Sequence, residues 1–450
     1  RFNELFGTKY YTYPIEEWFF ETESATDRLK KHFEVSSLKG FGIDKMDCGI
    51  SAAGAVLYYL DMTKHELVGH ITSISRIDES TCVLLDRFTL RNLEILDTLH
   101  EGGRSLADII DRTITPMGAR TLRRWLCMPL KKPADINERL DIVECFVHHE
   151  TERLELEQIL RTIGDLERLA SKIAVGRISP REMVQLKIAL QAIKPLKEQC
   201  LSTENEVLAK WTQQLDDCEV LSQRIDHEIR EDAPSMLNKG NVIAPGVNTE
   251  LDELREISSH GKELLLKMQQ REIENTGIPT LKISFNNVFG YYIEVTKTHV
   301  NKVPDTWIRK QTLVNAERYI TPELKEYEEK ILGAEDRIQE LESDIYNTLL
   351  AAAASYIKPI QLDARIISHI DALISFANIA VTNNYHRPEI NESFVIDIKG
   401  GRHPVIERQL PPGENYIDND LYLDNDKQQI IIITGPNMAG KSALLRQTAL

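Results

Sequence analysis

Hydrophobic residues recur at steps of three and four along most of this chain, which is the spacing of helices with one apolar face. Between residues 92 and 231 the period continues almost without interruption. Thr115 and Pro116 have the chemistry of an N-cap and a first helical turn, and Pro133 leads into a further helix at 136–146. We therefore expect a run of helices in this part of the chain.

The N-terminal part shows the same spacing in two segments, Asp27–Phe33 and Ile50–Met62. A strand-like segment, Thr81–Leu85, lies in the transitional stretch that follows. His65 and His70 have no partners at the spacing of metal ligands, so we interpret them as surface or capping residues. No catalytic group of residues is visible here.

Two long amphipathic helices are predicted at 249–274 and 322–357. In the second, apolar residues alternate at steps of three and four for three heptads, with charged residues between them. That pattern is typical of an antiparallel helix pair, and a helix of this length extends about 54 Å at ~1.5 Å per residue. The apolar positions are Leu251, Leu254, Ile257, Leu264, Leu265 and Met268 in the first helix, and Leu324, Tyr327, Ile331, Ala334, Ile338, Leu341 and Ile345 in the second.

The segment between these helices, residues 277–320, has a different pattern. Leu281–Phe285 alternates between apolar and polar residues, and Gly290–Val295 resumes the extended pattern after a turn at Asn286. Together they predict a β-hairpin. Because it is inserted between two long helices, such a β module has to lie at the far end of the helix pair.

Beyond the helix pair, residues 366–380 predict another apolar helix and Phe394–Ile398 a strand. We expect a nucleotide-binding domain to begin at Gly400, and the β-branched run Ile430–Ile433 to form a fully buried strand of a parallel sheet. The pattern as a whole predicts a multidomain, mainly α fold with small β insertions. It has a long antiparallel helix pair with a β-rich tip, and it ends in the start of an α/β domain.

The most specific motif lies near the C-terminal end and has the form G-x-x-x-x-G-K-[ST]. Its glycines let the backbone approach a phosphate, Lys441 neutralises phosphate charge, and the Ser442 hydroxyl ligates Mg²⁺. The bare pattern occurs by chance in ~2% of chains of this length. The β run before it and the helical pattern after it disfavour the alternative, a Gly-rich structural turn. The residues expected to bind nucleotide are Gly435, Pro436, Asn437, Met438, Ala439, Gly440, Lys441 and Ser442.

The chain begins at Arg1, without Met, and stops at Leu450, shortly after the motif. A P-loop domain needs further strands, one of which ends in an acidic residue for Mg²⁺ and the attacking water. We therefore expect an internal piece of a longer protein, with incomplete ATPase chemistry.

Composition changes this picture little. Hydrophobic residues make up 42% of the 450 and charged residues 28%, ordinary values for a soluble globular chain, whose length predicts about three domains. No apolar run reaches the ~18 residues of a membrane span. Six scattered cysteines without C-x-x-C or Cys/His ligand spacing are typical of buried thiols in a reduced cytosolic protein, and they disfavour a metal site.

The distribution of charge is more informative than its total. The net charge is −16, but residues 277–320 hold six basic side chains against three acidic ones, a net +3 that leaves −19 for the remainder. A basic tip on an acidic body suits a grip on a phosphate backbone, with a neutral structural cap as the alternative. An anion site is conceivable at four arginines, although ion pairs on solvated helix faces are favoured there. These are Arg120, Arg123, Arg124 and Arg168.

Six further segments stand out beside the phosphate loop: Thr115-Pro-Met-Gly, Ile163-Gly-Asp-Leu-Glu-Arg, Asn286-Asn-Val-Phe-Gly-Tyr-Tyr-Ile, Asn315-Ala-Glu-Arg-Tyr, Pro322-Glu-Leu-Lys-Glu-Tyr-Glu and Gly401-Arg-His-Pro. Together with the Pro-Asn-Met insert of the loop, they resemble the bacterial MutS family of DNA mismatch-repair proteins. The resemblance extends through the whole chain. It implies the end of a connector domain, a split lever domain, a DNA clamp and the start of a P-loop ATPase domain cut short after Walker A. The corresponding ranges are 1–63, 64–261 with 322–385, 262–321 and 386–450.

The resemblance also implies a function. Members dimerise, enclose duplex DNA, bend it at a mismatch, exchange ADP for ATP and recruit a MutL-type partner, in the bacterial cytoplasm and associated with the nucleoid. The implied DNA-contacting residues are Asn286, Arg309, Lys310 and Asn315. For the nucleotide, the resemblance implies Tyr416 stacked on adenine, Asn437 beside the γ-phosphate and Ser442 on a nucleotide-bound Mg²⁺.

Two departures from the family pattern lie near the nucleotide residues: Ala443 stands where Thr is common, and a small insertion at 411–414 precedes Tyr416. The chain also lacks the Phe-x-Glu wedge that reads a mismatch, and everything beyond the P-loop. The parent protein is thus expected to be a DNA-dependent ATPase, whereas this chain is expected neither to recognise a mismatch nor to turn over ATP.

Three other functions stay open. One is a MutS-related recombination protein without mismatch recognition. Another is a coiled-coil chromosome-organising ATPase, which is disfavoured because such proteins carry the P-loop before their coiled coil. The last is a non-catalytic DNA-binding scaffold whose P-loop is structural.

Overall fold

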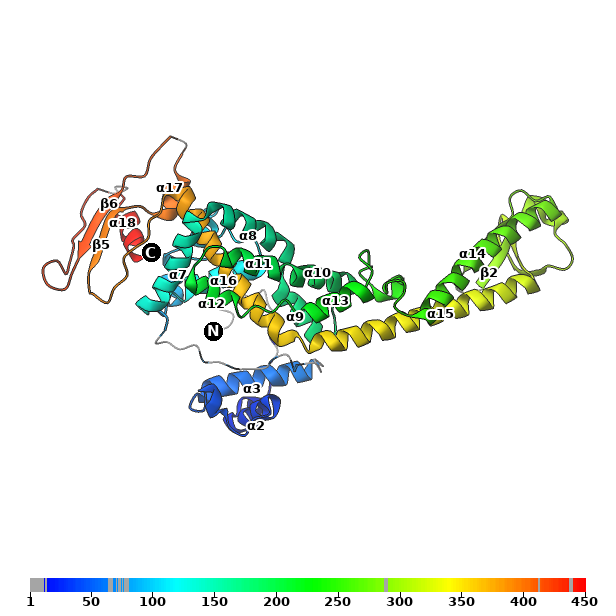
Figure 1. The fold of residues 1–450 in the computed structure, drawn as a ribbon, viewed down its shortest axis with the longest axis horizontal. Coiled ribbons are helices and arrows are strands. Elements are labelled where there is room, and N and C mark those ends of the chain that lie inside the picture. Colours follow the sequence, from blue (N-terminus) through cyan, green and yellow to red (C-terminus); the bar gives the residue numbers. More distant parts are fainter. Residues whose placement is uncertain are drawn as a thin grey trace. The chain divides into compact units, whose positions relative to one another are not determined.

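The computed structural model describes residues 12, 14–63, 68–69, 71, 74, 76, 81–286, 290–411, 413–436 and 440–450, without the side chains of 261, 262 and 330. The chain forms two compact units, which are described separately (Figure 1). The fold is mainly helical with small antiparallel sheets, as predicted. Unit 1 comprises Arg1–Arg177, Ile188–Glu219 and Ala354–Leu450, and unit 2 comprises Ile178–Lys187 and Val220–Ala353.

Unit 1 begins with η1 (Glu17–Phe20), α2 (Thr22–Phe33), η2 (Leu38–Phe41) and α3 (Asp47–Met62). These elements confirm the two helical segments predicted in the N-terminal part. At Gly54 of α3, a Cβ atom would lie 2.4 Å from the Cβ of Ala25, so this close approach to α2 requires glycine. The helices bury an apolar cluster of Ala25, Leu29, Leu38, Ile43, Ile50 and Leu57.

Helix α16 (Ile357–Asn383) is the core helix of unit 1, and α5 to α9 pack against it. By length and composition α16 could cross a membrane, but 67% of its most apolar window is buried in the fold. The helices between residues 87 and 228 are α4 (Arg87–Asn92), α5 (Leu106–Ile110), α6 (Pro116–Cys127), α7 (Pro133–His148), α8 (Glu150–Ile163), α9 (Leu166–Ala174), α10 (Pro180–Gln191), α11 (Ile193–Leu201), α12 (Glu206–Thr212) and α13 (Glu219–Glu228). They confirm the predicted run of helices.

The strand-like segment 81–85 was predicted wrongly. It contributes only an isolated β-bridge between Cys82 and Leu130. Among the described residues, no extended segment beside it continues this pairing into a strand. The cysteines are free thiols, and those of Cys145, Cys200 and Cys218 are buried as predicted. Cys48 is exposed, contrary to prediction, on the first turn of α3.

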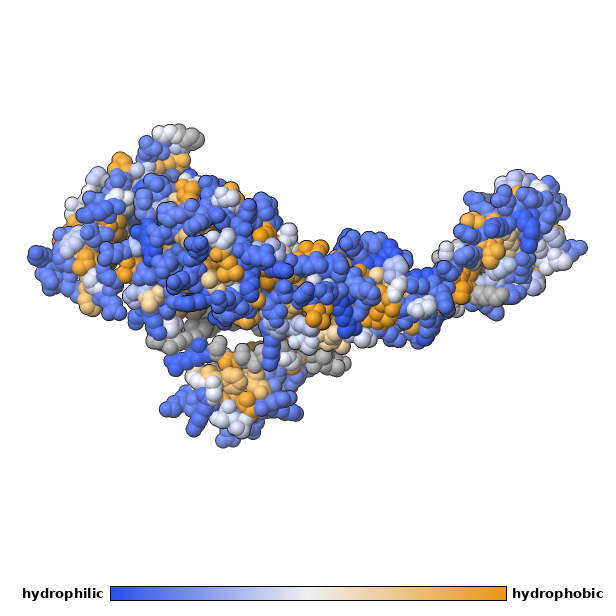
Figure 2. All heavy atoms as spheres, viewed as in Figure 1, coloured by the Kyte–Doolittle hydropathy of each residue, from blue (hydrophilic) through white to orange (hydrophobic). Residues whose placement is uncertain are grey.

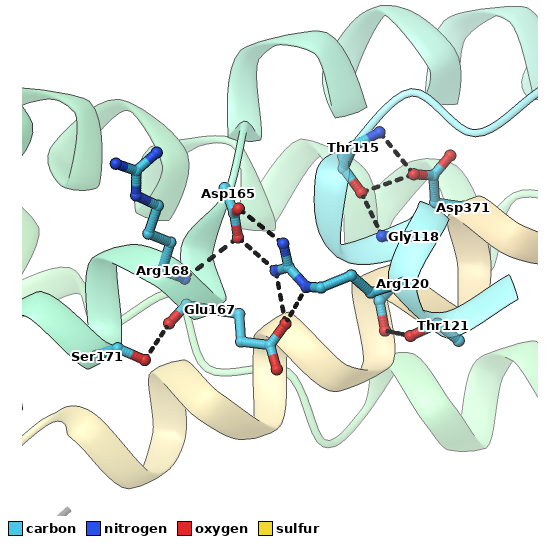
Figure 3. A network of polar contacts seen from close by, with 10 residues as sticks. Thr115, Gly118, Arg120, Thr121, Asp165, Glu167, Arg168, Ser171 and Asp371 are labelled. Atoms are coloured by element: carbon cyan, nitrogen blue, oxygen red, sulfur yellow. Dashed lines mark hydrogen bonds and ion pairs between the residues drawn. The ribbon is translucent and has the colours of Figure 1, made fainter. Parts of the chain in front are cut away.

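Asp371 of α16 fastens the start of α6 to the core of unit 1 (Figure 3). Its carboxylate accepts hydrogen bonds from the Thr115 amide (2.7 Å), the Thr115 hydroxyl (2.6 Å) and the Ile114 amide (2.9 Å). Thr115 Oγ1 in turn accepts from the Gly118 amide at 3.0 Å, which completes the predicted N-cap. A Cβ atom on Gly118 would lie 2.1 Å from Asp371 Oδ2, so the contact requires glycine.

Arg120 pairs with two acidic residues instead of lining an anion site (Figure 3). Its guanidinium donates to both oxygens of Asp165, at 2.8 and 3.0 Å, and to Glu167 Oε2 at 2.6 Å. Asp165 also caps α9 by accepting from the Arg168 amide at 3.2 Å. The ion-pair interpretation is therefore confirmed for Arg120.

Unit 2 is built on two long antiparallel helices, α14 (Thr249–Thr276) and α15 (Pro322–Ala354), which follow η3 (Leu237–Lys239). Three ion pairs fix their register: Arg337 to Glu250 at 2.9 Å, Arg255 to Glu342 at 2.6 Å, and Arg271 to Glu323 at 2.6 Å. The start of α14, at residues 250 and 255, pairs with the middle of α15, at residues 337 and 342, whereas Arg271 near the end of α14 pairs with Glu323 at the start of α15. The two helices are therefore antiparallel, which confirms the predicted helix pair.

The contact seam of α15 follows the prediction, whereas that of α14 is shifted. All seven predicted positions of α15 are buried or half-buried. On α14, Leu251, Ser258 and Leu265 are buried at intervals of seven, while Ile257 and Leu264 are 49% and 41% exposed. The prediction was wrong for Ile257 and Leu264. At this point the residue of α14 that faces α15 is the polar Ser258, whose hydroxyl donates a hydrogen bond to Glu335.

A four-stranded antiparallel sheet with the order β1-β2-β4-β3 lies at the end of this helix pair (Figure 1). Its first two strands are the predicted hairpin, and β2 pairs with β4 as well as with β1. The inner face of the sheet packs on the helices through Ile293, Val295 and Tyr319, which share an apolar cluster with Leu265 and Leu324. The elements are β1 (Lys282–Asn286), β2 (Gly290–Thr296), η4 (Lys297–Lys302), β3 (Ile308–Thr312) and β4 (Ala316–Ile320).

The C-terminal part of unit 1 contains a two-stranded sheet and two short helices, β5 (Ile396–Gly401), α17 (Pro404–Gln409), β6 (Asn419–Leu423) and α18 (Lys441–Ala449). The predicted strand near 394–398 is present. The predicted buried strand at 430–433 is not: Ile430 and Ile432 are 80% and 84% exposed. A buried strand needs hydrogen-bonded neighbours, and none of the described strands pairs with this segment.

Candidate functional sites

The predicted phosphate loop leads directly into α18, as its sequence predicts. Gly440 is the N-cap residue and has φ +81°, a left-handed conformation that favours glycine although nothing lies within 4 Å of a Cβ placed there. Lys441 therefore begins the helix, with the helix N-terminus facing the loop. The predicted site residues Asn437, Met438 and Ala439 lie outside the described residues.

The side chain of Lys441 folds back over the loop. Its ammonium donates hydrogen bonds to the carbonyl oxygens of Gly435 and Pro436, the second at 3.1 Å. Ser442 is exposed on the first turn of α18. The loop thus gathers one cation, one hydroxyl and helix amides at the same place, which are the groups that bind phosphate and its magnesium ion.

A cavity of about 440 Å³ opens beside the loop. Tyr416 and its neighbours Asn415 and Ile417 form part of its lining, and Lys441 with other residues of α18 forms another part. The structure therefore brings Tyr416 and Lys441 to one cavity, although an insertion at 411–414 precedes the tyrosine. The complete lining is Ile406, Leu410, Asn415, Tyr416, Ile417, Asn419, Ile433, Thr434, Gly440, Lys441, Ala443 and Leu444.

The phenol of Tyr416 is held from behind by α18. Its hydroxyl donates to Gln447 Oε1 at 2.9 Å. Burial raises the pKa of this phenol, and a hydrogen bond from the backbone of His403 opposes that shift. Sequence reasoning missed Gln447, because a glutamine within a helix has no motif of its own.

The second candidate site is the sheet end of unit 2, whose surface is mostly hydrophilic in Figure 2. Arg309 and Lys310 lie exposed on β3, at the edge of the sheet. The pairing of β3 with β4 shifts register between Arg309 and Gln311, so Lys310 occupies a bulge. Arg309 keeps 63% of its side chain exposed while its guanidinium lies 3.7 Å from Glu317.

The two asparagines predicted to contact DNA lie at opposite ends of the sheet. Asn286 pairs with Gly290 at the start of β2, whereas Asn315 precedes Ala316, which pairs with Thr296 at the end of β2. The length of β2 separates them by roughly 20 Å at ~3.3 Å per residue. The structure therefore does not bring all four predicted residues to one point.

The end of the sheet that contains Asn286 is fixed to α15. Glu328 accepts a hydrogen bond from the Tyr291 amide at 2.9 Å. A Cβ atom on Gly290 would lie 2.4 Å from this carboxylate, and Gly290 also has φ +74°. Asn315 lies at the other end of the sheet, where its carbonyl accepts a hydrogen bond from the Lys297 amide at 3.1 Å.

The outer face of the sheet also carries basic side chains that were not among the four residues predicted to contact DNA. Lys282 pairs across the strands with Glu294, and Glu294 forms an ion pair of 3.1 Å with Arg318. The Arg318 guanidinium also lies 4.2 Å from the ring centre of Tyr292. The sequence could have indicated these residues, because the alternation of apolar and polar residues in the two strands places Lys282 and Glu294 on the face opposite the apolar one.

Two family models match this chain: MutS domain III over residues 88–377 and MutS domain II over residues 10–72. The helical core around α16 and the long helix pair with its β sheet lie largely within the first of these matches. The fold and the phosphate loop thus define a multidomain helical protein built from MutS-type domains. The chain belongs to the MutS family.

The curated relatives include proteins named DNA mismatch repair protein MutS from three bacteria. They are those of Parabacteroides distasonis, 58% identical over 450 residues, Phocaeicola vulgatus, 59% identical over 449, and Bacteroides fragilis, 58% identical over 449. Each match covers 100% of this chain and 52% of the relative. The chain therefore spans about half the length of the curated relatives it matches.

Proposed function

We propose that this chain is part of a bacterial DNA mismatch-repair protein that grips duplex DNA with the sheet end of unit 2 and holds ATP or ADP at the phosphate loop. The family match and the names of the relatives support this function over a recombination protein or a scaffold. The proposal includes a second copy of the chain and a MutL-type protein as partners, and a cytoplasmic location. Its domains are a connector end at 1–63, a lever at 64–261 and 322–385, a DNA clamp at 262–321, and the start of an ATPase domain at 386–450.

The DNA grip rests on one observation, the concentration of exposed cations at the sheet end of unit 2. Arg309 is largely exposed, and Lys282, Lys297 and Lys310 form no ion pair with any residue that the structure describes. Unpaired cations release counterions when they meet phosphates, so they bind DNA without reading its sequence. The proposed grip is therefore electrostatic and blind to mismatches.

Fluorescence anisotropy on a labelled duplex, with and without a mismatch and over a salt series, tests this grip. The double variant Arg309→Glu, Lys310→Glu is expected to weaken binding and to lower the slope of log K against log salt by about 2. The control is Lys194→Glu, Lys210→Glu, which makes the same change of charge on the exposed surface of α11 and α12. Equal losses in both double variants, or none in the first, would overturn the assignment of the DNA grip to this sheet.

For the nucleotide, we propose Tyr416 as the wall for the base and Gly435–Ser442 as the cradle for the phosphates. The cavity of about 440 Å³ lies within the usual range of small-molecule sites, roughly 300–1,000 Å³, and the residues present fit such a ligand. Lys441 would exchange the loop carbonyls for phosphate oxygens, and Ser442 would supply a hydroxyl ligand to Mg²⁺. Bound ATP would supply a phosphoanhydride bond, the energy source of the proposed repair cycle.

A further inference from the structure

We propose that Gln447 is a positioning residue of the nucleotide site, which holds the Tyr416 ring in place as the wall for the base. This inference rests on the proposed nucleotide function. Gln447 lies on α18, the helix that begins with Lys441, and it is only 9% exposed. Its side chain does not line the cavity, so it acts through Tyr416.

The contact between the two side chains is direct and specific. The Tyr416 hydroxyl donates to Gln447 Oε1 at 2.9 Å, across 31 positions of the chain. Tyr416 lies in a segment without regular structure, between exposed neighbours, and Ile417 is 82% exposed. Tyr416 itself is half-buried, and its hydroxyl meets the Gln447 side chain and the backbone of His403, so these contacts help to orient the ring.

Gln447 is itself confined by β5. A Cβ atom on Gly401 would lie 2.4 Å from Gln447 Nε2, so the amide group fills the space that the absence of a side chain at Gly401 provides. Gly401 is paired with Asn419 of β6, which fixes its backbone. The amide is thus held between the two-stranded sheet and the tyrosine, and it cannot rotate away without losing one of these contacts.

In this arrangement one helix, α18, carries both the lysine proposed for the phosphates and the glutamine that contacts the proposed base wall. Lys441 lies in the first turn of α18, and Gln447 follows about 9 Å further along the axis at ~1.5 Å per residue. Since the same helix carries the phosphate-binding lysine and supports the base wall, the spacing between base and phosphates is set by α18. Loss of the Gln447 contact should release the base wall and leave the phosphate loop intact.

Isothermal titration calorimetry of the whole chain with two ligands tests this separation. ATP with Mg²⁺ needs both the base wall and the loop, whereas inorganic tripolyphosphate needs the loop alone. Gln447→Met and Tyr416→Phe each remove the hydrogen bond and keep the shape of the side chain. Each should weaken ATP binding about 5- to 10-fold, the value of one net hydrogen bond, and leave tripolyphosphate binding unchanged.

Three further variants sharpen the test. The double variant should bind ATP no more weakly than either single one, because both remove the same bond. Gln447→Glu keeps an oxygen acceptor for the tyrosine and should restore most of the affinity. Lys441→Ala should weaken both ligands. Thermal unfolding of each variant checks that α18 has remained folded.

The possible failures are distinguishable. If the unaltered chain binds neither ligand, the proposed nucleotide site is wrong and this inference falls with it. If it binds ATP and Gln447→Met binds ATP equally well, the site stands and the role of Gln447 is overturned. If Gln447→Met weakens tripolyphosphate as much as ATP, Gln447 supports the helix and not the base wall, which also overturns the inference.

Discussion

Arg446 forms an ion pair of 2.7 Å with Glu94, although 352 positions of the chain separate them. The backbone of Glu94 is left-handed, with φ +52°, and its other carboxylate oxygen accepts a hydrogen bond from the Leu99 amide at 2.7 Å. Both residues of the pair line a cavity of about 210 Å³ together with His100 and His403. The helix that follows the phosphate loop is thus tied to the segment before α5.

A double-mutant cycle on this ion pair should show a clear coupling. Glu94→Gln keeps the acceptor for the Leu99 amide and removes the charge, and Arg446→Met keeps the stem of the side chain. Because the Glu94 side chain is only 16% exposed, Arg446→Met leaves a poorly solvated carboxylate without its partner, whereas Glu94→Gln leaves the more exposed Arg446. Urea unfolding is expected to give a double variant less destabilised than the sum of the single ones, by about 1 kcal/mol. Additive losses would mean that the pair makes no net contribution.

Gly118→Ala should be strongly destabilising. The new methyl group would lie 2.1 Å from Asp371 Oδ2, on a buried carboxylate that already accepts three hydrogen bonds, so it would displace the anchor of α6. We expect a loss of about 2–4 kcal/mol in the free energy of unfolding of unit 1, measured by chemical denaturation.

The matched control for that substitution is Gly333→Ala on α15. Nothing lies within 4 Å of a Cβ at Gly333, and the residue is exposed within a helix. Alanine has the higher helix propensity, so a gain of up to about 1 kcal/mol is expected there. Similar effects of the two substitutions in chemical denaturation would contradict the steric argument at Gly118.

Asp363→Asn should stabilise the chain at neutral pH and not at acidic pH. Burial raises the pKa of Asp363 to about 7, and the nearby Asp216 and Asp217 act in the same direction. Between about pH 4 and pH 7 the folded chain keeps a proton that the unfolded chain has lost, so this group lowers stability as the pH rises. The asparagine side chain would still accept the hydrogen bond that the Asp216 amide donates to Oδ1 of Asp363 at 3.0 Å.

The gain should therefore be near zero at pH 4 and largest above pH 7. It can reach about 4 kcal/mol, because the pKa of the carboxyl rises from its ordinary value of 3.8 to about 7 on folding. Unfolding midpoints of both proteins in urea, measured from pH 4 to pH 8, check this expectation. A gain that does not change with pH would indicate that the effect comes from packing and not from the proton.

The features that could be predicted well from the sequence are those with a local cause. The period of α15 and the N-cap at Thr115 depend on residues close together in the chain, and both are present. The hairpin of β1 and β2 likewise depends on local alternation and a turn. The run at 430–433 failed as a strand because strand formation depends on partners elsewhere, which hydrophobicity does not supply.

The contacts around the candidate sites could not be predicted from local pattern. Asp371 reaches Thr115 across 256 positions, and Gln447 meets Gly401 and Tyr416 only after the sheet and α18 have packed. The loop motif predicted Lys441 as a phosphate-binding residue, since phosphate chemistry fixes the spacing of such residues. No sequence motif of this kind marks a residue that acts by positioning another side chain.

The bulge at Lys310 has a consequence for the state of the protein in solution. An edge strand offers a row of backbone groups that can join the sheet of another molecule, which is a route to aggregation. On β3 that row is interrupted by the register shift between Arg309 and Gln311, and charged side chains border it. The same residues that present positive charge therefore oppose the addition of a further strand at the β3 edge of the sheet.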